Sequence, residues 1–178
     1  MALTGDITVI RYGSSVDHQP IEYGIGKGAS GQTLYRGSIA AISGGTTVTQ
    51  GYLKNMASPA TSDVVVGLID DYGPGSGQAN TGPGLGGAVL NTADGVLTAN
   101  VITGTFLVFG GTGSDALTIT NVQKPVYLID EKTVGATSAS STRPQAGILV
   151  QVPGTDASIP TGMVAVQLGT QNGPWGGV

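Results

Sequence analysis

The sequence of 178 residues has the length of one domain, and its 31 glycines, nine prolines and 10% charged residues set it apart from ordinary soluble domains. The glycines follow no three-residue period, which excludes collagen, and 39% hydrophobic residues exclude a disordered polar chain. A net charge of −4 without a basic stripe argues against a nucleic-acid partner, and the absence of cysteine excludes disulfides and thiolate metal sites.

The beginning of the chain predicts an extended arm. The stretch MALTGDITVIRYG has no basic region followed by an apolar one, so we expect no signal peptide, and no apolar run approaches the roughly 18–20 residues of a membrane helix. Ile7–Ile10 predicts a short strand, and residues 13–31 are polar, rich in glycine and broken by Pro20. We therefore expect an N-terminal arm over residues 1–25 and a β domain over residues 26–178.

The first half of the domain predicts strands and a long loop. We expect strands over Thr33–Ile42 and Asp63–Ile69, and the continuous apolar run of the second fits a strand buried on both faces. Residues 70–87 are rich in glycine and proline, which predicts a long loop outside any sheet interior. Two interpretations of this loop stay open: a floppy excursion, or a loop that orders against a neighbouring subunit.

The second half predicts a series of strands, because extended segments alternate with turn residues and helix signals are almost absent. Turn signals at this spacing predict an all-β fold, a single compact β-barrel or β-sandwich. In Pro125–Asp130 we expect Val126 and Leu128 on one face and Tyr127 and Ile129 on the other. The expected strands are Gly95–Asn100, Thr105–Phe109, Ala116–Asn121, Pro125–Asp130, Gly147–Val152 and Met163–Leu168.

The segment Gly26–Gly31 matches the pattern G-x-G-x-x-G of dinucleotide-binding loops. Such a loop must follow a strand and open a helix, because the pyrophosphate sits on the helix N-terminus. Here Pro20–Gly24 is a poor parallel strand, and the pattern after the loop is that of another strand. Lys27 is followed by Gly28 rather than by Ser or Thr, which also excludes a P-loop. We predict a glycine-rich turn.

The chain offers no catalytic constellation. His18, the single histidine, lies beside Asp17 in a polar segment, and there is no G-x-S-x-G elbow, so we interpret it as a surface histidine. A histidine metal site would lack further His or Cys ligands. We expect no enzyme and no cofactor.

Two acidic pairs, Asp70-Asp71 and Asp130-Glu131, fall at expected strand ends. Neighbouring residues on a strand point to opposite faces, which does not suit paired carboxylates acting together. We predict solvated turn caps. A weak Ca²⁺ site has no D-x-D-x-D spacing to support it.

Several aromatic residues fall in segments predicted to be arm, loop or tail. Trp175, the single tryptophan, lies in the Gly- and Pro-rich tail 169–178, where it would be either a core plug or an interface anchor; we favour the anchor. Tyr12, Tyr23 and Tyr72 are placed where contact between subunits is expected.

Five segments follow one another in this order: Gln32–Ile42, Gly51–Leu53, Val65–Asp71, Lys124–Val134 and Arg143–Val150. Together they resemble the capsid cement, or head decoration, proteins of tailed bacteriophages. The similarity covers most of residues 30–152 and lies in apolar and glycine positions rather than in a catalytic motif. The glycine-proline stretch 73–87 is longer and richer than the family pattern, and the tail after Met163 has no counterpart in it.

The resemblance implies a structural virion protein on the outer surface of the capsid, made in the host cytoplasm. Its partners would be the major capsid protein and further copies of itself, as a homodimer or homotrimer, with no nucleic acid and no membrane. Arms add strands to a neighbour's sheet edge, so we expect contacts mainly in residues 5–25. The candidate capsid or subunit contacts are Ile7, Val9, Arg11, Tyr12, Ile21, Tyr72 and Trp175.

Two alternatives remain. A glycan-binding β module on a virion or cell surface would use an exposed aromatic beside carboxylates, and Tyr72 next to Asp70 and Asp71 is the candidate patch. A β-sheet hydrolase would need His18, since the sequence offers no other obvious general base near neutral pH.

Overall fold

The protein is nearly all β. The computed structural model describes Tyr12 and residues 20–26, 32–45, 50–72, 87–89, 94–95 and 97–169. No helix in this part of the chain is long and apolar enough to cross a membrane. Its elements, in chain order, are β1 (Ile21–Gly24), β2 (Gln32–Leu34), β3 (Ile39–Ile42), β4 (Leu53–Lys54), β5 (Val64–Tyr72), β6 (Gly87–Val89), β7 (Thr98–Ile102), β8 (Gly104–Gly110), the 3₁₀ helices η1 (Gly113–Asp115) and η2 (Ile119–Asn121), β9 (Pro125–Asp130), β10 (Thr133–Gly135), β11 (Gln145–Gln151) and β12 (Met163–Leu168).

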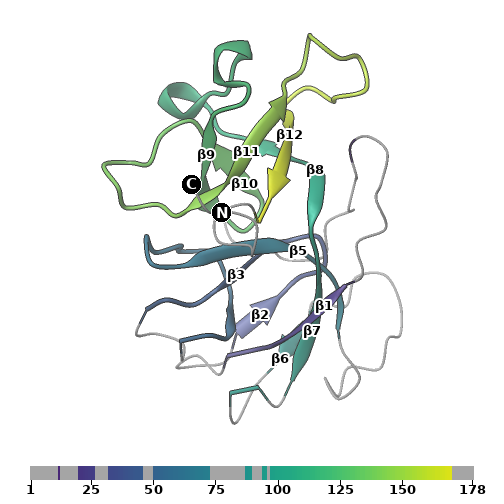
Figure 1. Ribbon diagram of the computed structural model, residues 1–178, viewed down its shortest axis with the longest axis vertical. Helices are drawn as coiled ribbons and strands as arrows, with labels where there is room; N and C mark the ends of the chain where they lie inside the picture. Colours follow the sequence, from purple (N-terminus) through teal and green to yellow (C-terminus); the bar gives the residue numbers. More distant parts are fainter. Residues whose placement is uncertain are drawn as a thin grey trace.

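The second half of the chain closes into a barrel in the order β10-β8-β12-β11-β9. Its strand pairs are antiparallel except for the pair of β8 and β10, which is parallel. Closure leaves no free edge in the barrel. The barrel forms the upper part of the molecule in Figure 1, and it confirms the predicted all-β class.

The first half, together with β7, forms a sheet of order β1-β7-β5-β3-β4, drawn in the lower part of Figure 1. The two ends of this sheet approach each other, because a bridge joins Ile25, just after β1, to Leu53 of β4. The Gly26 N–H donates to the Leu53 carbonyl at 2.9 Å. Strands β2 and β6 form a separate two-stranded sheet.

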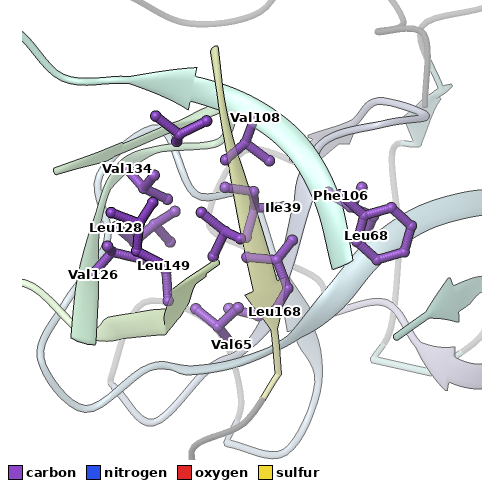
Figure 2. Close-up of a cluster of buried hydrophobic side chains, with 14 of the residues drawn as sticks. Ile39, Val65, Leu68, Phe106, Val108, Val126, Leu128, Val134, Leu149 and Leu168 are labelled. Carbon is purple, nitrogen blue, oxygen red and sulfur yellow. The ribbon is translucent and has the colours of Figure 1, made fainter. Parts of the chain in front are cut away.

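One hydrophobic core joins the barrel to the sheet. Figure 2 shows buried side chains of both meeting there, among them Leu128 and Leu149 of the barrel and Ile39 and Val65 of the sheet. Each fully buried aliphatic side chain contributes about 1.5–3 kcal/mol. A single residue, Thr103, separates β7 of the sheet from β8 of the barrel. The two halves are therefore one compact body.

Strand β5 is the central strand of the sheet. Val65 and Leu68 belong to the core shared with the barrel, whereas Ile69 belongs to a second cluster on the other side of the sheet. The prediction of burial on both faces is confirmed. The faces of β9 are also confirmed, because Val126 and Leu128 are fully buried.

The strand expected over Thr33–Ile42 is two strands, β2 and β3, separated by a turn. Gly37 adopts a φ of 79°, a left-handed conformation that interrupts a strand. The Ser38 hydroxyl donates to the Tyr35 carbonyl at 2.7 Å and closes the turn. The predicted single strand was wrong at this point.

The strand expected over Ala116–Asn121 is also wrong, because this segment leads into η2. The Thr118 N–H donates to Oδ1 of Asn121 at 2.9 Å, in a capping box that starts the short helix. Local side-chain bonds of Thr and Asn compete with strand pairing. Ile119, the apolar residue of the segment, is 56% exposed.

The segment expected as a loop over residues 70–87 is shorter than that range. Strand β5 continues through Asp70 and Asp71 to Tyr72, and β6 begins at Gly87. The residues between lie outside the described part of the chain. Likewise β1 lies within the segment 1–25 that the sequence predicted as an arm.

Candidate contact surface

Tyr12 lies against the protein's own barrel. Its backbone N–H donates to the Thr105 carbonyl of β8 at 2.9 Å, and its hydroxyl donates to Oδ2 of Asp156. Its ring packs on a cluster formed by Leu107, Ile159 and Ala165. The residue predicted as a contact for another molecule is thus held within the same chain by two hydrogen bonds and by apolar packing.

The cluster under Tyr12 lies on the outside of the barrel. Leu107 of β8 pairs with Ala165 of β12, and the residues that alternate with Leu107, Phe106 and Val108, face the core. Outward-facing residues of a barrel are usually exposed, yet Leu107 is only 8% exposed and Ala165 is fully buried. Ile159, from the turn before β12, covers them together with Tyr12.

The charge state of Asp156 suits its role as acceptor. The Tyr12 hydroxyl and then the Ser158 N–H, at 2.8 Å, donate to its carboxylate and hold its pKa below the ordinary value. The same hydrogen bond, followed by desolvation and by the charge of Asp156, raises the pKa of Tyr12. Both shifts favour an ionised Asp156 and a protonated Tyr12.

Ile21 lies at the exposed end of an apolar row that crosses the sheet. In the register of β1, β7 and β5, Ile21 is opposite Val101, and Val101 is opposite Ile69. Val101 and Ile69 are 1% exposed, but Ile21 is 51% exposed. β1 is the outermost strand at this end of the sheet, so the row ends open to solvent at Ile21.

Sequence reasoning missed two other exposed apolar side chains, Phe109 and Ile119. Phe109, 41% exposed, lies on the outer face of β8, opposite Met163, and the ammonium of Lys132 lies 5.8 Å from the centre of its ring. The period-2 alternation of β8 could have indicated Phe109, since it shares a face with Leu107.

Of the other residues that the sequence singled out, the structure describes only some. Tyr72 is the last residue of β5, where its backbone pairs with Ala99 of β7. Asp70, two residues before Tyr72 in the candidate glycan patch, forms an exposed ion pair in which its Oδ1 lies 3.7 Å from the guanidinium of Arg36. Ile7, Val9, Arg11, His18 and Trp175 lie outside the described residues.

The second acidic pair is divided by its surroundings. Asp130 caps the turn as predicted, accepting the Lys132 N–H at 3.0 Å. Glu131, however, is 2% exposed, so the predicted solvated cap is wrong for this residue. Its carbonyl accepts the Ile39 N–H at 2.7 Å, which brings the start of β3 onto this turn and buries it.

The sequence raised two kinds of site, a metal site and a dinucleotide-binding loop, which the described residues can be compared with. No group of three or more His, Cys, Asp or Glu side chains that could hold a metal ion occurs among them. Gly26 belongs to the bridge with β4, and the first element after the glycine-rich segment is the strand β2. A dinucleotide-binding loop must be followed by a helix, and here a strand follows. This agrees with the interpretation of Gly26–Gly31 as a turn.

A partly buried ion pair joins Arg143 and Asp115 at one end of the barrel. Arg143 donates to Oδ1 of Asp115 at 2.8 Å, and the Thr137 hydroxyl donates to the same oxygen at 2.6 Å. Desolvation raises the pKa of Asp115, but the hydrogen bonds from Thr137 and Arg143 and the Arg143 charge outweigh it and leave the pKa below its ordinary value. This pair fixes the loop between β10 and β11 against η1.

Comparisons of the chain with protein-family models, with curated proteins and with solved structures each found no match.

Proposed function

We propose that this protein is a capsid cement, or decoration, protein. It binds the outer surface of a bacteriophage head and bridges subunits of the major capsid protein, which stabilises the DNA-filled shell. The order of apolar and glycine segments over residues 30–152 resembles that of the capsid cement proteins of tailed bacteriophages, and the low content of charged residues agrees with a protein that works in an assembly.

One observation carries the proposal: the described residues of the N-terminal region, Tyr12 and those of β1, lie on the outer surface of the β body. Tyr12 is anchored on the barrel, and Ile21, 51% exposed, lies on the outermost strand of the sheet. An edge strand with an exposed apolar side chain is a surface that suits a further strand from a partner. The 11 residues before Tyr12 supply a segment that can reach a neighbour.

The energetics of such a function are those of linkage and avidity. A protein that binds only the expanded shell stabilises that shell by mass action. Several weak contacts, each made to a different capsid subunit, combine into tight binding without a strong single contact. The net charge of −4 agrees with a position outside the shell, away from the DNA.

The test is co-sedimentation of the purified protein with expanded capsid shells, with unexpanded procapsids as the control. We expect saturable binding to expanded shells alone, with a stoichiometry that names the symmetry axis. Absence of binding to shells would overturn the proposal.

Two variants locate the contact. Deletion of residues 1–11 keeps Tyr12 and its anchor, and we expect it to weaken shell binding at least tenfold. Ile21→Ser should weaken binding as well, whereas Ile119→Ser is the matched control, since Ile119 is similarly exposed at 56% but lies on η2. Equal binding by all three variants would exclude the N-terminal part as the contact.

A further inference from the structure

The outer edge of β1 has backbone groups without a strand partner in the described part of the chain. Residues of an antiparallel strand alternate between facing the partner strand and facing away. The Ile25 N–H donates to the Leu97 carbonyl at 2.7 Å, on the side of β7, and the Gly26 N–H donates to Leu53 on the other side. By this alternation the backbone N–H and carbonyl groups of Ile21 and Tyr23 point toward β7, and those of Glu22 point outward, away from β7.

The apolar face of β1 requires a particular neighbour. Ile21 and Tyr23 lie on the same face, opposite Val101 and Ala99, and Tyr23 packs on the second core cluster. A strand added outside β1 would complete this layer if it placed apolar side chains beside Ile21 and Tyr23 and a polar one beside Glu22.

We propose that the N-terminal segment of a second copy of this chain adds to the outer edge of β1 as an antiparallel strand. The segment Ile7-Thr8-Val9 has the required alternation. With Val9 opposite Ile21, Ile7 lies opposite Tyr23. Thr8 then lies opposite Glu22, where the two residues exchange backbone hydrogen bonds. The pair of an aromatic and a β-branched side chain is a favourable cross-strand pair.

The anchor at Tyr12 favours a second copy over the same chain. Tyr12 is bonded to Thr105, which is four residues from Val101, the partner of Ile21, and four residues of strand span at most about 13 Å. Val9 is three residues from Tyr12 and can lie at most about 11 Å from it. This short reach restricts how a chain anchored at Tyr12 could bring its own Val9 to its own Ile21, whereas the segment of a second copy meets no such limit.

This inference goes beyond the proposed function, because it concerns self-association without any capsid. Mutual exchange of arms between two copies gives a closed two-fold dimer, and exchange around a ring gives a higher closed oligomer. A protein that binds shells but stays monomeric would retain the proposed function and overturn this inference. A protein that associates with itself but does not bind shells would support this inference and overturn the proposed function.

The cysteine-free chain allows a direct test of the register. In the proposed pairing, residues 9 and 21 form a non-hydrogen-bonded pair with Cα atoms about 4.5 Å apart, which suits a disulfide. We expect Val9→Cys and Ile21→Cys single variants, mixed and mildly oxidised, to form a heterodimer linked by a disulfide. Val9→Cys mixed with Ile119→Cys is the matched control and should remain unlinked.

Two outcomes would overturn the proposal. One is an equal yield of heterodimer with the Ile119→Cys control. The other is a disulfide confined within one chain when both substitutions are placed in the same molecule, because that would locate Val9 beside its own Ile21.

Sedimentation velocity gives a second test that needs no cross-link. Glu22→Pro removes the outward N–H while leaving the bonds to β7, since proline is tolerated at such edge positions. We expect it to weaken self-association at least tenfold, and Glu22→Gln, which keeps the N–H, to leave self-association intact. A wild-type protein that remains monomeric at millimolar concentration would also exclude the proposal, whatever the fold of the proline variant.

Discussion

Tyr12 and Asp156 are 144 positions apart in the sequence, and a hydrogen bond joins the hydroxyl of one to the carboxylate of the other. This bond, with the one from the Tyr12 N–H to Thr105, holds Tyr12 on the outside of the barrel. The fixed point matters for both proposals, since the reach of the arm is measured from it.

The first prediction separates the ring of Tyr12 from its hydroxyl. Tyr12→Phe removes the bond to Asp156 and keeps the packing on Leu107 and Ile159, so the segment should stay docked but exchange its amide hydrogens severalfold faster. Tyr12→Ala should lose the docking and expose the cluster. Hydrogen exchange of peptides covering residue 12 and Ile159 measures both effects. Unchanged exchange in Tyr12→Ala would show that the ring does not hold the segment.

The second prediction is a pH dependence with two limits. The pKa of Asp156 is lowered from 3.8, so its contribution to docking is complete above that ordinary value and is lost as the pH falls through the lowered pKa. The pKa of Tyr12 is raised from 10.0, so its contribution is complete below 10.0 and is lost as the pH rises through the raised pKa. Docking should be strongest between these limits.

Ultraviolet absorbance measures the upper limit directly. The difference titration between the wild-type protein and Tyr12→Phe reports the ionisation of Tyr12, which we expect above pH 10.0. In Asp156→Asn the midpoint should move down toward the ordinary value. The same midpoint in both backgrounds would contradict the role given to Asp156.

The third prediction concerns a buried ion pair between β4 and the turn before β5. The Lys54 ammonium lies 2.7 Å from Oδ2 of Asp63, whose side chain is fully buried, and the Ala60 N–H donates to the same oxygen. Lys54→Met leaves a buried carboxylate without its counter-charge, which should reduce the free energy of unfolding by about 3 kcal/mol. Urea denaturation measures the loss. Lys124→Met, at an exposed lysine, should change stability by less than about 0.5 kcal/mol.

The fourth prediction tests a close approach of two barrel strands. A Cβ atom on Gly147 of β11 would lie 2.0 Å from the carbonyl oxygen of Gln167 on β12, so one strand must shift. Gly147→Ala should destabilise the protein by about 1–3 kcal/mol, measured as a lower denaturation midpoint. Gly45→Ala is the control, because among the described residues its Cβ would meet only the Ser62 hydroxyl, at 3.8 Å. Similar midpoints for the two variants would contradict the packing described for the barrel.

The sequence predicts best where a strand is made by its own pattern. The bounds of β9 and β12 match the prediction, because in each a short, mostly apolar run is enclosed by polar and turn residues. The prediction fails where one local conformation overrides the pattern. Gly37 divides β2 from β3 by its positive φ, and the bond between Thr118 and Asn121 starts η2 where a strand was expected.

The candidate site was less predictable than the fold. The sequence indicated Tyr12 and Ile21 as contacts because they lie in a segment without a core pattern. The sequence could not indicate Asp156, because the proximity of Asp156 to Tyr12 depends on how β8 and β12 pair in the barrel. Nor could it distinguish Tyr12, which is held by its own chain, from Ile21, which is open to solvent, because both follow from tertiary packing.

The passage of the chain from β7 through Thr103 into β8 has a mechanical consequence. A load that pulls the sheet away from the barrel meets a continuous covalent strand and the interleaved side chains of one core, rather than a hinge between two units. Strands loaded along their length must break their lateral hydrogen bonds together instead of one after another. Under an applied pulling force the protein should therefore unfold abruptly and at high force, and not by gradual extension.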